Sequence, residues 1–108
     1  MNSFTPSSSA IPATSMRRLH IESVEVLQRV ARMLDPGGEM RPRIEVLLER
    51  LDRHPLVASG DHSSVCVCCQ DILALIGDHL LRDEIYMLIQ RLRRARAGID
   101  PYLPNCTD

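Results

Sequence analysis

The sequence contains no lysine and no tryptophan, and it holds only one phenylalanine and two tyrosines among 108 residues. Because aromatic residues make up 3% of the chain, any core has to be built from Leu, Ile, Val and Met. Such a core is typical of helix-on-helix packing, whereas sandwiches and barrels rely on aromatic and β-branched strand residues. The composition therefore favours an all-α fold.

A strong charge balance is also missing, since the net charge is −1. This gives no overall reason to expect a nucleic-acid or anionic-membrane partner. No apolar run approaches the roughly 20 residues of a membrane span, and the first residues lack the pattern of a secretory signal. Cys66, Cys68 and Cys69 lie too close together for a disulfide framework. We therefore expect a cytoplasmic protein.

Recognisable catalytic motifs are absent from the sequence. It has no Gly-rich phosphate loop, no H-E-x-x-H and no Gly-x-Ser-x-Gly elbow. Its acidic residues alternate with arginine, as is typical of solvated helix faces. The histidines fall near the predicted helix ends or linkers, and they are His20, His54, His62 and His79. We predict that the protein is not an enzyme.

Four segments of the chain show helical periodicity. They share apolar residues at three- and four-residue steps and cover residues 16–34, 41–54, 63–76 and 81–97. Pro and Gly separate them, because Pro cannot donate within a helix and Gly is the usual left-handed cap. We predict a four-helix domain over 16–98, made of one hairpin at 16–54 and another at 62–98.

Both ends of the chain are predicted to be tails. Residues 1–15 are rich in Ser, Thr and Pro and carry no charged side chain. Such a segment buries too little to offset its ordering entropy, so we predict disorder, with an export address as the alternative. Residues 99–108 are predicted to be a short C-terminal tail.

The two hairpins resemble one another at an offset of 41 residues. Without a gap, 22–53 and 63–94 are identical at ten of thirty-two positions. Duplication and a coincidence of amphipathic pattern both explain this. A hairpin of this size is too small to bury a stable core alone, so we predict an antiparallel four-helix bundle of two hairpins, which could also dimerise. A fragment of a helical solenoid is the alternative.

The cysteines of the third predicted helix suggest three chemistries. Cys68 stands opposite Leu27, so we predict that it is a small buried hydrophobe. His62, Cys66 and Cys69 follow at i, i+4 and i+7, a spacing that could hold Zn²⁺. The candidates for a fourth ligand are His54, His79 and Cys106. Structural thiols and redox or intermolecular disulfide chemistry are the alternatives.

The end of the fourth predicted helix is basic. Its arginines are Arg82, Arg91, Arg93, Arg94 and Arg96. They wrap around the helix instead of forming one stripe, which is typical of a solvated face. A nucleic-acid surface and an acidic protein partner stay open as alternatives.

These patterns predict a small helical protein–protein interaction module or adaptor that self-associates. The first and third predicted helices each carry two apolar stripes, one more than a bundle interior needs. The predicted interaction residues are Arg91, Arg93, Arg94, Arg96, Val67, Leu73 and Ile76. A nucleic-acid-associated regulator and a metal- or redox-responsive switch at Cys66 and Cys69 are the alternative functions.

Overall fold

The computed structural model describes residues 11–35, 37–54, 62–77 and 80–102. Within these ranges the chain forms four helices and no strand, which confirms the all-α prediction. The helices are α1 (Ala13–Met33), α2 (Met40–Arg53), α4 (His62–Ile76) and α5 (Arg82–Arg96). Their ends differ from the predicted bounds by at most three residues.

The helix ends follow the residues that interrupt the periodicity. α1 begins directly after Pro12, because the missing N–H of a proline costs nothing at a helix start. α4 and α5 are followed by Gly77 and Gly98, whose φ angles of 62° and 80° lie in the left-handed region. Glycine adopts that region without steric cost, so both helices end where glycine stands.

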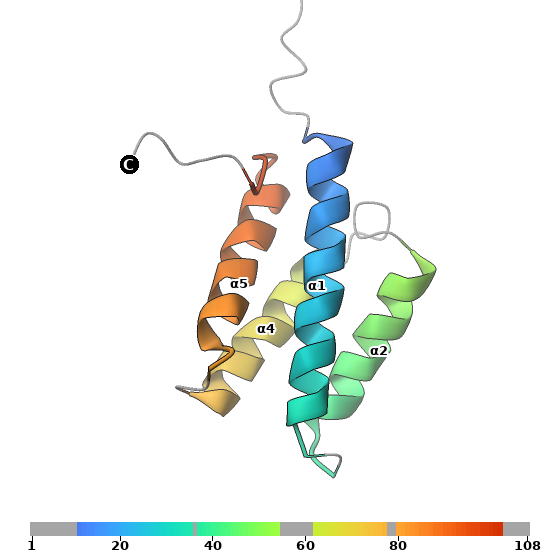
Figure 1. Ribbon diagram of the computed structural model, residues 1–108, viewed down its shortest axis with the longest axis vertical. Coiled ribbons are helices and arrows are strands. Elements are labelled where there is room, and N and C mark those ends of the chain that lie inside the picture. Colours follow the sequence, from blue (N-terminus) through green and yellow to red (C-terminus); the bar gives the residue numbers. More distant parts are fainter. Residues whose placement is uncertain (1–10, 36, 55–61, 78–79, 103–108) are drawn as a thin grey trace, which may run out of the picture.

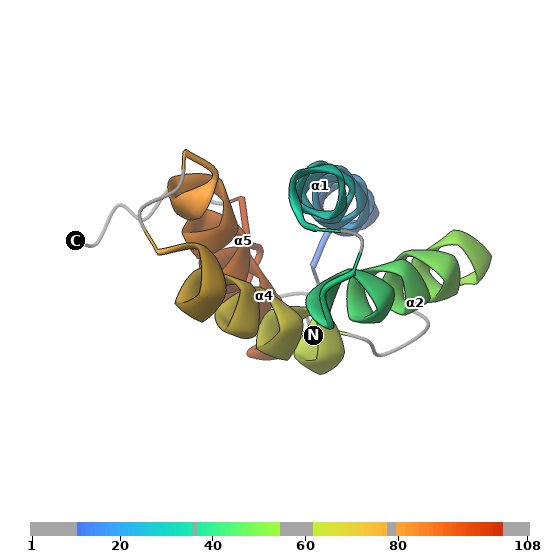
Figure 2. The same ribbon diagram turned by 90° about the horizontal axis from the view of Figure 1, so that it is seen from below.

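The helices are arranged as two hairpins. α1 ends and α2 begins at the same end of the molecule where α4 ends and α5 begins (Figure 1). α1 also packs on α5 and α2 on α4, so the four helices form a bundle with α2 and α5 on opposite sides (Figure 2). The packing of α4 on α5 is the most extensive of these contacts. This arrangement is consistent with the predicted bundle of hairpins.

The core consists of aliphatic side chains contributed by all four helices. The largest fully buried ones include Leu19, Leu27, Ile44, Leu51, Ile72, Ile85, Leu88 and Leu92. Ser23 is also buried, and its hydroxyl donates to the carbonyl of Leu19 at 2.8 Å, so its polar group is satisfied. None of the helices in the described ranges is long and apolar enough to cross a membrane.

Some residues of both predicted tails pack against the helices. Of the predicted N-terminal tail, residues 1–10 lie outside the described ranges, and Ile11 packs against the core. Of the predicted C-terminal tail, 103–108 lie outside. Pro101 is buried, and Tyr102 packs against the core. The packed domain therefore extends beyond α5 to Tyr102.

Candidate interaction surface

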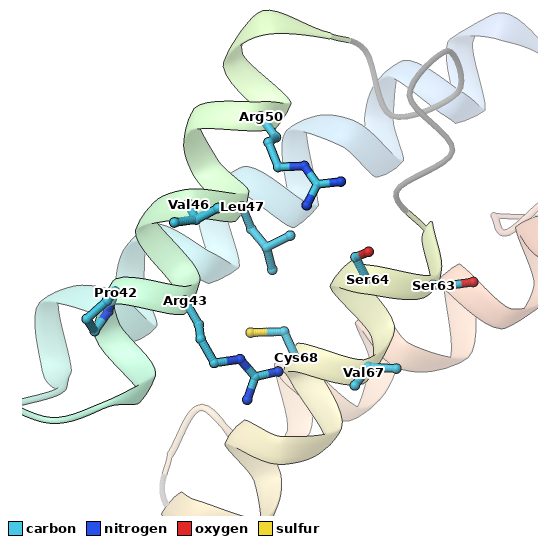
Figure 3. Close-up of a pocket in the computed structure, with 9 residues that line it drawn as sticks. All are labelled: Pro42, Arg43, Val46, Leu47, Arg50, Ser63, Ser64, Val67 and Cys68. Atoms are coloured by element: carbon cyan, nitrogen blue, oxygen red, sulfur yellow. The ribbon is translucent and has the colours of Figure 1, made fainter.

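A groove of about 600 Å³ lies between α2 and α4. Its lining residues are Pro42, Arg43, Val46, Leu47 and Arg50 from α2 and Ser63, Ser64, Val67 and Cys68 from α4 (Figure 3). Leu47 and the thiol of Cys68 extend from the two helices toward one another and form the floor. Val46 and Val67 are half-exposed, at 53% and 50%. The groove therefore offers solvent an apolar surface on both helices.

Helical periodicity explains why these side chains line one groove. Arg43, Val46 and Arg50 recur at three- and four-residue steps, which places them in one row along α2. This row lies beside the buried stripe that includes Leu47, so the same helix supplies both the floor and a wall. On α4, the exposed Val67 likewise lies next to a buried residue, Cys68, so this helix also supplies both a wall and part of the floor.

The polar rim of the groove is more basic than acidic. Arg43 Nη1 donates to Asp71 Oδ2 at 2.9 Å, and this hydrogen bond raises the pKa of Arg43. Both side chains of this pair are about half exposed. Arg50 adds a second positive charge, and the first turn of α4 adds the positive end of its dipole. Two arginines and the start of α4 therefore lie on the rim, where Arg43 is paired with Asp71.

All three cysteines of α4 are buried. The prediction for Cys68 is confirmed, and Cys66 and Cys69 are also covered. Burial raises the pKa of Cys69, and it raises the pKa of Cys68 although Arg43 lies nearby. These two thiols are therefore poor nucleophiles at neutral pH.

The structure places the predicted zinc ligands along α4. His62 is half-buried at the helix start, with Cys66 and Cys69 buried behind it. Across the described ranges, no group of three or more His, Cys, Asp or Glu side chains is placed to hold a metal ion. Of the fourth-ligand candidates, His79 and Cys106 lie outside those ranges. Zinc binding stays a prediction.

The raised thiol pKa values predict a loss of stability at alkaline pH. The unfolded chain releases thiol protons above about pH 8.5, whereas the folded chain retains them. The free energy of unfolding is therefore expected to fall above that pH by up to about 1.4 kcal/mol per pH unit for each thiol. Urea unfolding in reducing agent between pH 7 and 9.5 measures the slope. Cys69→Ala should give a shallower slope, and an unchanged slope would contradict the assignment.

The predicted interaction residues do not form one surface. Val67 lines the α2–α4 groove, while Leu73 and Ile76 are half-buried against the core. Arg93 and Arg96 are exposed on α5, and Arg94 is half-buried there. Arg91 faces α1, where its Nη1 donates to Glu22 Oε2.

A polar cluster that the sequence did not predict joins the C-terminal segment to α1. The Tyr102 hydroxyl donates to Glu22 Oε1, the carboxylate that also accepts from Arg91. The Tyr102 ring lies 4.2 Å from the Arg18 guanidinium and 5.0 Å from that of Arg91. Burial and the Glu22 carboxylate raise the pKa of Tyr102. The available signal was the Asp-Pro-Tyr turn, in which Tyr102 N–H donates to Asp100 Oδ1.

Two grooves between the hairpins lie at corresponding positions of the repeat. A smaller groove of about 240 Å³ lies between α1 and α5. Six of its lining residues have a counterpart, 41 positions away in the chain, that lines the α2–α4 groove. These six are Glu22, Val26, Asp83, Glu84, Met87 and Arg91. Val46 thus corresponds to Met87, and Ser63 to Glu22. This is the geometry expected of a pseudo-twofold arrangement, while duplication itself stays a hypothesis.

The α1–α5 groove is smaller and is bridged by two ion pairs, whereas the larger α2–α4 groove carries the single pair Arg43–Asp71. Glu22–Arg91 and Arg29–Glu84 connect α1 to α5. Ser63 and Gln70 stand at the positions on α4 that correspond to Glu22 and Arg29. α4 therefore lacks both charges with which α1 bridges its groove, and this groove is the stronger candidate for binding.

No protein-family model, curated protein or solved structure matches the chain.

Proposed function

We propose that the protein is a small non-enzymatic interaction module, an adaptor that binds an amphipathic helix of a partner protein in the α2–α4 groove. The observation that supports this is the pair of half-exposed valines, Val46 and Val67, beside the apolar floor of Leu47 and Cys68. A groove between two helices accepts a third helix whose apolar residues recur at three- and four-residue steps. We expect this binding to take place in the cytoplasm.

The rim of the groove specifies the charge of the partner. Because the charged residues that line the groove, Arg43 and Arg50, are both basic, acidic residues beside the apolar stripe of the partner are favoured. Basic residues at the same positions would meet like charge, which opposes binding. The proposed ligand is therefore a helix with an apolar stripe flanked by Glu or Asp.

A designed peptide pair tests this proposal. Both peptides are helical with the same Leu stripe, one flanked by Glu and the other by Lys, and each carries a fluorophore. Fluorescence anisotropy is expected to show tighter binding of the Glu-flanked peptide by about tenfold or more, which corresponds to about 1.4 kcal/mol. Equal binding of the two peptides, or no binding, would refute the proposal.

The corresponding positions of the two grooves provide a matched control. Val46→Glu is expected to weaken binding of the Glu-flanked peptide by at least about tenfold, because it places a carboxylate on the apolar wall. Met87→Glu changes a similarly exposed residue (46%) at the corresponding position on α5 and should leave binding unchanged. Circular dichroism verifies that both variants are folded. Equal losses in the two variants would point to non-specific hydrophobic binding.

A further inference from the structure

A second groove, of about 610 Å³, lies on the other flank of α2, between α2 and α1. Its apolar residues include Ile21, Val24 and Leu48, and its carboxylates are Glu25, Glu49 and Asp52. Ile21 is half-exposed, and Val24 and Leu48 are partly buried against the core. We call this the acidic groove.

The acidic groove is open because of two polar residues on α1. Glu25 and Gln28 line it and are exposed, whereas Cys66 and Cys69 occupy the corresponding positions on α4 and are buried. Small thiols allow α5 to pack closely on α4, while a carboxylate and an amide have to stay in water. The α1–α2 hairpin therefore leaves exposed the surface that the α4–α5 hairpin buries.

The carboxylates of the acidic groove are incompletely neutralised. Glu49 accepts from Arg53 at 3.2 Å, an exposed pair one helical turn apart. Among the contacts of the described residues, none involves Glu25 or Asp52. The groove thus combines apolar side chains with two carboxylates available to a partner, and it fits a helix with an aromatic or aliphatic centre flanked by arginine.

α5 presents such a surface on its outer side. Arg82, Tyr86, Gln90 and Arg93 follow at steps of four, four and three residues, so they form one row along the helix. This row points away from α1, because Glu84 and Arg91, which contact α1, lie on the opposite side of α5. Tyr86 is half-exposed, and no contact of a described residue involves Arg82 or Arg93. We call this row the basic ridge.

We propose that the acidic groove binds the basic ridge of a second copy of this chain. Tyr86 would insert among the apolar residues of the groove, with Arg82 and Arg93 positioned to pair with Asp52 and Glu25. The opposite charges of the two surfaces select this occupant. Bidentate arginine–carboxylate pairs beside a buried aromatic ring are the contacts that contribute most at such interfaces.

The geometry makes this contact head-to-tail. α2 and α5 lie on opposite sides of the bundle, so one pair of molecules cannot exchange both contacts (Figure 2). Such a heterologous contact leaves a groove at one end and a ridge at the other, and it builds rings or chains. One ridge in one groove is a small interface, so we expect micromolar or weaker association that decreases as salt is added.

Two charge-reversal variants test the proposal without touching the α2–α4 groove. Glu25→Arg/Asp52→Arg disables the acidic groove, and Arg82→Glu/Arg93→Glu disables the basic ridge. All four residues are exposed, so the fold should be retained. In sedimentation velocity, each variant alone should stay monomeric at concentrations where the unmodified chain associates. Their equimolar mixture should associate again, beyond a dimer of twice 12.2 kDa, because the ridge of the first variant fits the groove of the second and the two reversed surfaces are opposite in charge.

The outcomes separate this proposal from the proposed partner-binding function. An unmodified chain that stays monomeric, single variants that associate like the unmodified chain, or a mixture that stays monomeric would each overturn it. Val46→Glu should self-associate like the unmodified chain. If Val46→Glu abolished association while both charge reversals retained it, self-association would use the α2–α4 groove instead and this proposal would be wrong.

Discussion

The double variant Cys66→Glu/Cys69→Gln is expected to lose its cooperative fold. It places in α4 the residues that stand at the corresponding positions of α1, Glu25 and Gln28. In α4 these positions are buried against α5, where a carboxylate and an amide would have no water and no partner. Burying such groups costs several kcal/mol, a large part of the roughly 5 to 15 kcal/mol that stabilises a small domain.

Two further variants keep this prediction measurable if the double variant does not fold. Cys69→Ser is expected to lower the free energy of unfolding by about 1 to 3 kcal/mol, because it replaces a buried apolar thiol with a polar hydroxyl. The reverse exchange, Glu25→Cys/Gln28→Cys, should change it by less than about 1 kcal/mol, because those positions are exposed. Urea unfolding under reducing conditions gives all three values. Equal losses in the two directions would contradict the different roles assigned to the two hairpins.

Glu22→Ala is expected to cost about 2 to 3 kcal/mol of stability, because it removes the acceptor shared by Arg91 and Tyr102. Glu22 and Arg91 are only 23% and 27% exposed, so water replaces the lost carboxylate poorly. The C-terminal segment should also detach from α1, since the Tyr102 hydroxyl and both neighbouring guanidinium groups converge there. Tyr102→Phe, which removes one hydroxyl, should cost about 1 kcal/mol.

The second ion pair between α1 and α5 is the control for this prediction. Arg29 and Glu84 are 46% and 43% exposed, so Glu84→Ala should cost less than about 1 kcal/mol. Thermal and urea unfolding of the three variants give the comparison. A loss in Glu84→Ala as large as that in Glu22→Ala would show that the Tyr102 cluster adds no stability of its own.

Sequence periodicity was sufficient to predict the helices, because each one has a continuous apolar stripe and ends at Pro or Gly. The offset of 41 residues also predicted the burial of Cys68, whose counterpart Leu27 is buried too. The same offset gave no clear answer for Cys66 and Cys69. Burial there depends on how closely α5 packs on α4. That packing is determined by the thiols themselves together with the residues of α5, a different helix.

The interaction surfaces were only partly accessible from the sequence. Val67 was predicted as an interaction residue and lines the α2–α4 groove. Val46, which lines the same groove from α2, was not predicted, because the groove depends on how the two hairpins pack. Arg91 was assigned to a basic end of α5, but its charge is compensated by Glu22, 69 residues earlier in the chain. Such a long-range pair leaves no local pattern.

The most direct test of the central claim is a ¹H–¹⁵N NMR titration of the labelled protein with the Glu-flanked peptide. If the α2–α4 groove is the docking site, the perturbed amides will cluster at Val46, Leu47, Val67 and Cys68. The corresponding residues of the other groove, Met87, Leu88, Val26 and Leu27, will stay unchanged. Equal perturbation of the two grooves, or shifts spread evenly over the bundle, would contradict the claim.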